Sequence, residues 1–167
     1  MKIKIKAKVY IDGANIFYTQ RKMGWSLKWK KVINWLRKEF DIVEFRYYVS
    51  LKKGDKSMLK YIAYLKDGLK FTVLTKPLKK IQTEEGRWVY KGNFDVEITA
   101  DMLGDNSSFG SVILFSGDSD FAYLGKLMKK RGKKFLIVSS RKTISWELKM
   151  ASDKYFLLDD LRKDLTR

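Results

Sequence analysis

The chain has 167 residues, of which 45% are hydrophobic, and this size and composition suit one globular domain with its own core. It contains no cysteine and no histidine, which excludes disulfides, zinc sites with Cys or His ligands, and Ser-His-Asp or Cys-His catalysis. Lysine and arginine number 36 against 19 acidic residues, and the formal net charge of +17 favours polyanionic partners, nucleic acid before an acidic membrane surface, with simple solubility as the alternative explanation.

The N-terminal half alternates strand and helix patterns. In chain order it predicts a strand at 4–12, a helix from Ser26 to 40, a strand at 42–51, a helix from Asp55 or Ser57 to near Gly68, a strand at 71–75 and a hairpin at 79–91. Runs of β-branched and aromatic residues indicate the strands, and apolar residues at helical spacing indicate the helices. The hairpin prediction depends on a Glu-Gly turn between two short runs of mixed polar and apolar residues.

The C-terminal half continues the alternation. It predicts a helix at 94–103, a strand at 111–115, a helix from Phe121 to Lys130 ended by Gly132, a strand at 135–139, a helix at 144–150, an edge strand at 155–158 and a final helix. The strands in this half are continuously apolar, which is typical of strands buried on both faces.

These patterns predict a single domain over residues 1–167 with an α/β fold and a mostly parallel sheet covered on both faces. One proline and the lack of a Gly/Ser-rich linker fit one domain. No apolar run approaches the roughly 20 residues needed to span a bilayer. The N-terminal stretch MKIKIKAKVY lacks the apolar core of a signal peptide. We therefore expect a cytoplasmic protein without a membrane segment.

Acidic residues follow two of the predicted strands, at the edge where the functional groups of parallel sheets gather. Asp118 and Asp120 directly follow the strand at 111–115, in the segment FSGDSDF. Asp12 closes the first strand in YIDGAN, and Asn15 lies in the first turn of the helix expected after it. Both segments have an alternative explanation as turn and helix-cap residues, which satisfy free backbone N–H groups without any chemistry.

A third acidic segment, KGNFDVEITAD, places Asp95 in the first turn of a helix. The buried stripe expected for this helix is Val96, Ala100 and Leu103, with Asp95 at its edge. Asp101 lies roughly 120° around a regular helix from Asp95, so both cannot reach one metal without a distortion or a bridging water. The alternatives are a favourable charge at the helix N-terminus for Asp95 and a solvated or supporting residue for Asp101.

Together the three segments predict one carboxylate cluster. Carboxylates held close together repel, and their pKa values rise unless a cation neutralises them. Oxygen ligands without histidine or thiolate suit Mg²⁺ or Mn²⁺. Such ions polarise a phosphate and acidify a water for in-line attack. Asp12, Asp95, Asp118 and Asp120 therefore predict a divalent-metal site for phosphodiester chemistry.

At these residues the chain resembles the NYN domain family, a branch of the PIN-like ribonucleases. The matching motifs, in order, are Asp12-Gly13-x-Asn15, Lys91-Gly92-x-x-Asp95-Val96 with Asp101-Met102-Leu103, Ser116-Gly117-Asp118-Ser119-Asp120-Phe121 with Gly132 after it, Ser145-x-x-Leu148, and Asp153-x-Tyr155-x-x-Leu158. One departure is Asn93-Phe94, which stands where family members often carry small apolar residues.

The resemblance implies a three-layer α/β/α PIN-like fold and metal-dependent cleavage of RNA. The metal ligands that it implies are Asp12, Asp95, Asp118 and Asp120. It also implies that Asn15 orients a ligand or phosphate and that Asp101 assists catalysis. Ser116 would hydrogen-bond a carboxylate or the nucleic acid. PIN-like domains often associate, so a homodimer is a further expectation.

A basic and aromatic group around the predicted hairpin is the candidate surface for single-stranded RNA. Its members are Lys76, Lys79, Lys80, Arg87, Trp88 and Lys91. Cations bind phosphates, and aromatic rings stack on unpaired bases. The alternative is a solvated hairpin whose Trp88 packs on the core. A second basic run, at residues 129–134, is expected at a helix C-terminus away from the acidic edge, where cations are favourable anyway.

Three functional hypotheses follow. The first is a metal-dependent ribonuclease. The second is a non-catalytic RNA-binding or regulatory domain of the same fold, whose binding is sensitive to salt and survives Asp118→Asn. The third is another phosphoryl enzyme with an Asp-x-Asp motif. A Toprim-like enzyme needs Glu where this chain has Asp12, and a haloacid-dehalogenase-like enzyme needs Asp where it has Ala14, so the third hypothesis is disfavoured.

Overall fold

The computed structural model of the protein describes residues 3–166. Its strands are β1 (Ile5–Asp12), β2 (Phe40–Leu51), β3 (Thr72–Pro77), β4 (Lys79–Gln82), β5 (Trp88–Lys91), β6 (Ser111–Phe115), β7 (Lys134–Ser139) and β8 (Lys154–Leu157). Its α-helices are α1 (Gly13–Met23), α2 (Trp29–Glu39), α3 (Lys56–Ala63), α4 (Asp95–Gly104), α5 (Ala122–Lys130), α6 (Trp146–Ala151) and α7 (Arg162–Thr166). A π-helical turn, η1 (Tyr64–Gly68), extends α3, and two 3₁₀ turns, η2 (Ser119–Phe121) and η3 (Leu158–Leu161), precede α5 and α7.

Six strands form one sheet in the order β3-β2-β1-β6-β7-β8, and every neighbouring pair is parallel. The predicted α/β class is therefore confirmed. The chain moves from β1 outward to β2 and β3, and then returns to place β6, β7 and β8 on the other side of β1. The strand order thus reverses between β1 and β6. In open α/β sheets, this reversal creates the crevice in which ligands bind, at the carboxyl ends of the strands.

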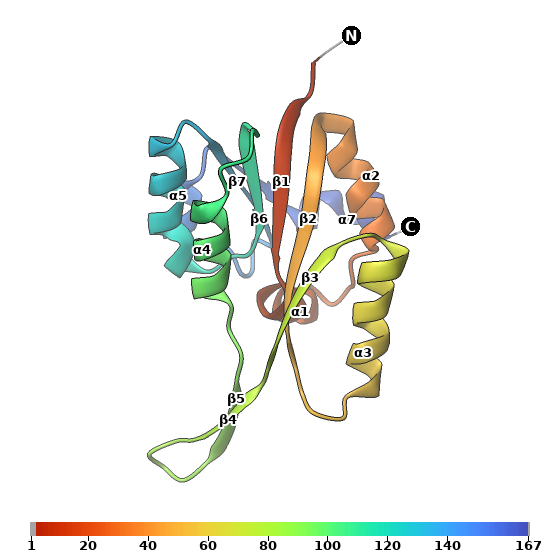
Figure 1. Cartoon of the computed structure of the whole chain (residues 1–167), viewed down its shortest axis with the longest axis vertical. Coiled ribbons are helices and arrows are strands. Elements are labelled where there is room, and N and C mark those ends of the chain that lie inside the picture. The colour runs from red at the N-terminus through yellow and green to blue at the C-terminus, as the bar shows by residue number, and fades with distance from the viewer. Residues whose placement is uncertain (1–2, 167) are drawn as a thin grey trace.

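Helices cover both faces of the sheet, so the fold has three layers (Figure 1). Alternate side chains of one strand enter different cores: Val9 and Ile11 pack on one face, and Tyr10 packs on the other. The first core includes residues of α1, α2, α3 and α7. The second includes residues of α4, α5 and α6. Because each central strand is apolar on both sides, the continuous apolar pattern of β6 and β7 is explained.

The β4–β5 hairpin stands apart from the main sheet. Its strands pair only with each other in the described part of the chain, and all residues of both strands are exposed. The turn is closed by Gly86, whose φ of 77° is the left-handed conformation expected for the Glu-Gly turn. Figure 1 shows the hairpin reaching past the edge of the sheet at which α1 begins. The predicted hairpin is therefore confirmed, with its side chains presented to solvent.

Several predicted element boundaries are corrected by the structure. Ser26 does not cap α2, because the helix begins after Lys28 and no described side chain hydrogen-bonds at this cap. Phe40 belongs to β2, where it pairs with Ile5, although its spacing also fits the preceding helix. Asp55, one of two expected starts, does cap α3 by accepting a hydrogen bond from the Met58 amide at 2.9 Å.

Two helices show why apolar spacing is a limited guide. Only the first turn of α1 was expected, because its large apolar side chains Phe17 and Tyr18 are exposed and leave a weak pattern. In α4 the predicted stripe is wrong except for Leu103, which packs partly buried against the core: Val96 is 79% exposed, and the fully buried residues are Ile98 and Met102. Both sets have helical spacing, and the larger side chains take the core.

Candidate active site

The acidic residues of β1 and β6 meet in the crevice where the strand order reverses. Ile11 pairs with Phe115, so the next residues, Asp12 and Ser116, lie side by side where the two strands end. The Ser116 hydroxyl donates to the Asp12 carboxylate at 3.2 Å. The expected meeting of these two segments at one edge of the sheet is therefore present.

Asp12 is buried at the start of α1, with 6% of its surface exposed. Its carboxylate accepts hydrogen bonds from the Asn15 amide and the Ser116 hydroxyl, both at 3.2 Å. Burial, with a smaller contribution from the negative charges of Asp95 and Asp118, nevertheless raises the pKa of Asp12 to about 6 against the opposing effect of these two bonds. Asp12 is therefore both a helix cap and a destabilised anion.

Gly13 allows this tight start of α1. A Cβ atom at this position would lie 2.4 Å from the backbone carbonyl oxygen of Tyr48, closer than van der Waals contact permits. A side chain at Gly13 would therefore push α1, and with it the Asp12 cap, away from β2. The Asp-Gly pair of the first motif has a packing reason in addition to turn geometry.

The loop after β6 is held by its own side chains. The Asp118 amide donates to the Ser116 hydroxyl at 3.2 Å, and the Asp120 amide donates to the Asp118 carboxylate at 3.0 Å. Gly117 packs so closely that a Cβ atom would lie 2.2 Å from the Thr143 carbonyl oxygen. Asp118 thus caps η2, as the cap explanation expected, and still contributes a carboxylate to the crevice.

Asn15 joins α1 to this loop. Its side-chain oxygen accepts a hydrogen bond from the Gly117 amide at 3.0 Å. Thr19, one turn further along α1, lies 2.9 Å from the Thr143 hydroxyl, which in turn lies 3.1 Å from that of Ser139. Thr19 is far in the sequence from Ser139 and Thr143, and no local motif marked these three residues. They connect α1 to the loop after β7.

Asp95, at the first position of α4, completes the cluster. Carboxylate oxygens of Asp95, Asp118 and Asp120 lie within 4.8 Å of one another. Burial raises the pKa of Asp95, and the negative charges of Asp118 and Asp120 raise it further, while the hydrogen bond from the Asn93 amide group, at 3.0 Å, opposes them. The cluster is thus a concentration of negative charge that its own surroundings leave only partly compensated.

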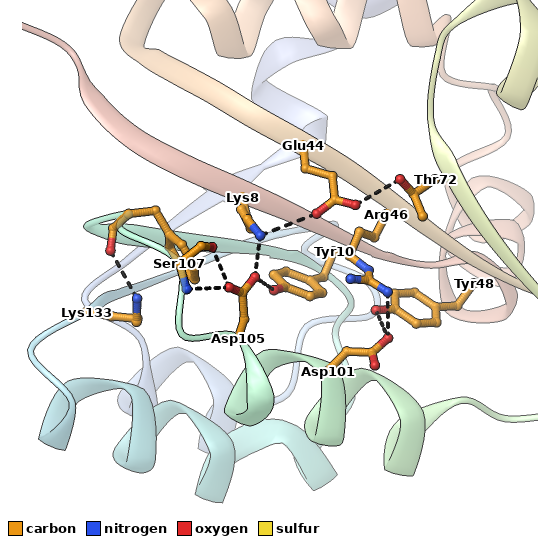
Figure 2. A network of polar contacts seen from close by, with 11 residues as sticks. Lys8, Tyr10, Glu44, Arg46, Tyr48, Thr72, Asp101, Asp105, Ser107 and Lys133 are labelled. Carbon is orange, nitrogen blue, oxygen red and sulfur yellow. Dashed lines mark hydrogen bonds and ion pairs between the residues drawn. The ribbon is translucent and has the colours of Figure 1, made fainter.

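Asp101 does not join this cluster. Its carboxylate accepts hydrogen bonds from the Arg46 guanidinium at 3.1 Å and from the Tyr48 hydroxyl at 2.8 Å. Figure 2 shows Asp101 facing these two β2 side chains across the space between α4 and the sheet. Asp101 therefore faces β2 and fixes α4 to the sheet.

Ser116 and Lys76, both expected to contact nucleic acid, are engaged elsewhere. Ser116 is fully buried, and its hydroxyl bonds the Asp12 carboxylate, the first of the two roles that the family resemblance implied. Lys76 forms an ion pair with Glu97 at 2.6 Å and lies over the Phe94 ring. This lysine links β3 to α4 and also lowers the pKa of Asp95 through its charge.

The hairpin side chains, by contrast, are free of the core. Trp88 is 57% exposed, so the alternative that it packs on the core is wrong. The Lys80 ammonium lies 4.8 Å from the centre of its ring. Arg87 pairs with Glu85 at the exposed tip, whereas Lys79 and Lys91 lie opposite each other at the base. Positive charge therefore gathers at the base of the hairpin, next to the sheet.

The donor set fits a hard divalent cation. Three carboxylates converge, and histidine and cysteine are absent from the sequence. Oxygen-only sites of this kind suit Mg²⁺ or Mn²⁺, which would neutralise the charge that raises the pKa of Asp95. Asp95, Asp118 and Asp120 are the residues that could hold such an ion, with Asp12 beside them.

A three-layer domain with a carboxylate cluster at the switch point of a parallel sheet agrees with the PIN-like, nuclease-type fold that the sequence resemblance implied. Comparison with known families makes the assignment specific. The chain belongs to the NYN domain family, whose model matches residues 6–159.

Two relatives extend over nearly the whole chain. The Low amplitude and bright protein LabA of Synechococcus elongatus is 33% identical in an alignment 163 residues long, and the alignment covers 92% of this chain and 84% of LabA. A crystal structure of a protein of unknown function from Vibrio parahaemolyticus has a TM-score of 0.81 at 27% identity and covers 99% of both chains. The fold is therefore shared with a solved structure over its full extent.

Within the described residues, every helix is too short or too polar to cross a membrane.

Proposed function

We propose that this protein is a Mg²⁺- or Mn²⁺-dependent ribonuclease that hydrolyses phosphodiester bonds of single-stranded RNA in the cytoplasm. The observation that carries the proposal is the convergence of the Asp95, Asp118 and Asp120 carboxylates, within 4.8 Å of one another, beside the buried Asp12. Membership of the NYN domain family supports a nucleic-acid substrate. The formal net charge of +17 supports it independently, because a polyanion is attracted to such a surface.

The aspartates of the cluster would have different roles, because they are held in different ways. The Asp118 carboxylate accepts a hydrogen bond from the Asp120 amide, and the Asp118 amide donates to the Ser116 hydroxyl, so the Asp118 carboxylate is positioned before any ligand arrives. Asp12 is fixed by two hydrogen-bond donors at the back of the crevice. A bound divalent ion would supply charge neutralisation at the scissile phosphate and an acidified water for in-line attack.

Asn15 and Asp101 would act through other residues. The Asn15 side-chain oxygen holds the Gly117 amide, so its contribution to catalysis would be the position of the Asp118 loop. Asp101 would keep α4, and therefore Asp95, at its distance from the sheet through Arg46 and Tyr48. Loss of either residue should lower activity less than loss of a metal ligand.

The first experiment is cleavage of 5′-end-labelled single-stranded RNA in EDTA, Mg²⁺ or Mn²⁺. We expect cleavage only with metal, and a loss of at least about 100-fold in Asp118→Asn, because groups that merely orient metal ligands already account for 10–100-fold. The matched control is Asp41→Asn, the same change at an exposed position near the start of β2, away from the carboxyl ends of the strands. This control should cleave as the wild type does.

Two results would overturn the ribonuclease. If the wild type and Asp118→Asn both bind RNA and neither cleaves it with any metal, the protein is a non-catalytic RNA-binding or regulatory NYN domain. Equal cleavage by the wild type and Asp118→Asn would assign the activity to a contaminating nuclease.

A further inference from the structure

A large groove opens beside the acidic cluster, between α1, the start of α2, α3 and the base of the hairpin. Its volume is about 1350 Å³, which exceeds the roughly 300–1,000 Å³ of ordinary small-molecule pockets. None of the metal-ligand aspartates lines it. This volume is larger than one compact small ligand needs.

Exposed aromatic rings line both sides of this groove. Phe17 of α1 is 60% exposed, Tyr64 after α3 is 41% exposed, and Tyr90 of the hairpin is 50% exposed. Behind Tyr64 the Tyr61 hydroxyl accepts a hydrogen bond from the Trp29 indole at 2.6 Å, and the Tyr61 and Tyr64 ring centres lie 6.4 Å apart. The inner rings are fixed, whereas the outer rings are exposed to solvent. Arg21 lies over one face of Phe17 and Lys52 over one face of Tyr90, which leaves one face of each ring for stacking. Free aromatic faces are what unpaired bases stack on.

Lysines crowd the start of α2, at the mouth of the groove. Lys28, Lys30 and Lys31 lie at the N-cap and in the first turn of this helix, and all three line the groove. Cations there are unfavourable, because the N-terminus of a helix carries partial positive charge. The first turn has no acidic residue, and no side chain in residues 3–166 caps it. An anion bound at this place would remove the repulsion.

The charge of the groove is otherwise almost uniform. Lys91 adds a fourth lysine from the hairpin, and Asp55 is the one acidic residue in the lining. The Asp55 carboxylate already caps α3. This excess of positive charge matches a phosphate backbone and disfavours a basic protein segment.

The groove is continuous with the carboxylate cluster at two points. Gly13, in its lining, directly follows Asp12. Asn93, also in its lining, donates a hydrogen bond to the Asp95 carboxylate at 3.0 Å. A strand lying in the groove would therefore enter the crevice between these two aspartates.

We propose that this groove binds the single-stranded RNA that flanks the scissile phosphodiester. Its phosphates lie against the α2 lysines, and its bases stack on Phe17, Tyr64 and Tyr90. The orientation toward the cluster rests on the proposed ribonuclease function, but binding in the groove needs neither metal nor cleavage. The hairpin base contributes to this surface through Tyr90 and Lys91.

The test is fluorescence anisotropy with a 5′-labelled oligouridine in EDTA, where nothing is cleaved. Lys28→Gln/Lys31→Gln should weaken binding about 10-fold and reduce the slope of log affinity against log salt by about 1.4, since each single-strand phosphate contact contributes about 0.7. The control Lys129→Gln/Lys130→Gln makes the same change at the far end of α5 and should alter affinity less than about 2-fold.

A second pair of variants tests stacking. Tyr64→Ala should weaken binding by about 10-fold, within the range of one base–aromatic stack. Tyr155→Ala, on the edge strand β8 and 42% exposed against 41% for Tyr64, should leave the affinity unchanged. Circular dichroism should show that all variants are folded. The lysine variant should have a melting temperature no lower than that of the wild type, because it removes positive charge that is unfavourable at the N-terminus of α2.

The outcomes separate the groove from the enzyme. Equal losses of affinity in the groove variants and their controls would show general attraction to a basic surface and not binding in the groove. Unchanged affinity in both groove variants would refute the proposal. A wild-type protein that does not bind the oligouridine would also refute it. If the groove variants bind more weakly but the wild type never cleaves RNA, the groove proposal stands and only the proposed ribonuclease activity is refuted.

Discussion

At the scale of single residues, Asp12 combines two opposed properties. It is the hydrogen-bonded cap of α1, and it is also buried among other carboxylates, so that its pKa rises to about 6 against an ordinary value of 3.8. A cap alone is served equally well by a neutral asparagine. The carboxylate is therefore kept at the expense of stability, which is common for groups that serve function.

This gives a prediction for Asp12→Asn. Because the pKa of Asp12 is raised in the fold, its contribution to stability is fully present below about pH 4 and is lost as the pH rises through 6. In EDTA, Asp12→Asn should be more stable than the wild type by about 1–3 kcal/mol at pH 7.5 and nearly equal near pH 4. Urea unfolding at both pH values measures the difference. A variant less stable than the wild type at pH 7.5 would contradict this account.

At the scale of elements, α4 is attached to the sheet by two carboxylates one turn apart. Asp101 reaches Arg46, and Asp105 pairs with the buried Lys8, which also lies 3.4 Å from Glu44 (Figure 2). Burial alone would raise the pKa of Asp105, but hydrogen bonds from Lys8 and Ser107 outweigh it and lower the pKa to about 2. Since α4 begins with Asp95, this attachment also sets the place of a cluster residue.

Asp105→Asn should therefore destabilise the fold. The fold depresses the pKa of Asp105. The stabilisation from its carboxylate is therefore present at pH values above its ordinary pKa of 3.8 and is lost as the pH falls through about 2. We expect a loss of about 2–4 kcal/mol at pH 7, because Lys8 is left buried with a weaker partner. Asp160→Asn, which breaks the exposed pair with Arg141, should change stability by less than about 0.5 kcal/mol. Equal effects of both substitutions in chemical denaturation would show that the buried pair has no special weight.

At the scale of the whole molecule, metal binding should be visible as global stability. A ligand that binds only the folded state at ten times its dissociation constant stabilises the fold by about 1.4 kcal/mol. For a domain of this size we expect a rise of about 4 °C in the melting temperature with Mg²⁺ or Mn²⁺. Asp118→Asn should show no such rise. A thermal melt followed by circular dichroism makes the comparison, and an equal rise in both proteins would place the bound ions outside the cluster.

Much of the fold could be predicted from the sequence because it depends on local patterns. The apolar runs of β6 and β7 and the cap at Asp55 were visible in neighbouring residues. Predictions failed where two elements competed for the same pattern: Phe40 fits a helix and a strand, and α4 has two possible apolar faces. Spacing alone does not decide such cases, because the choice depends on which side chains fill the space opposite.

The sequence by itself determined the type of fold, the kind of ligand atoms and the segments that carry them, because these depend on composition and on residues that follow one another in a strand and its turn. Only the tertiary structure decided which carboxylates meet. It joined Asp95 to Asp118 and Asp120, and turned Asp101 toward Arg46. It also assembled the groove beside the crevice from α1, α2, α3 and the hairpin. Contacts between segments that are distant in the sequence are set by how the helices pack on the sheet, and no local sequence pattern encodes that packing.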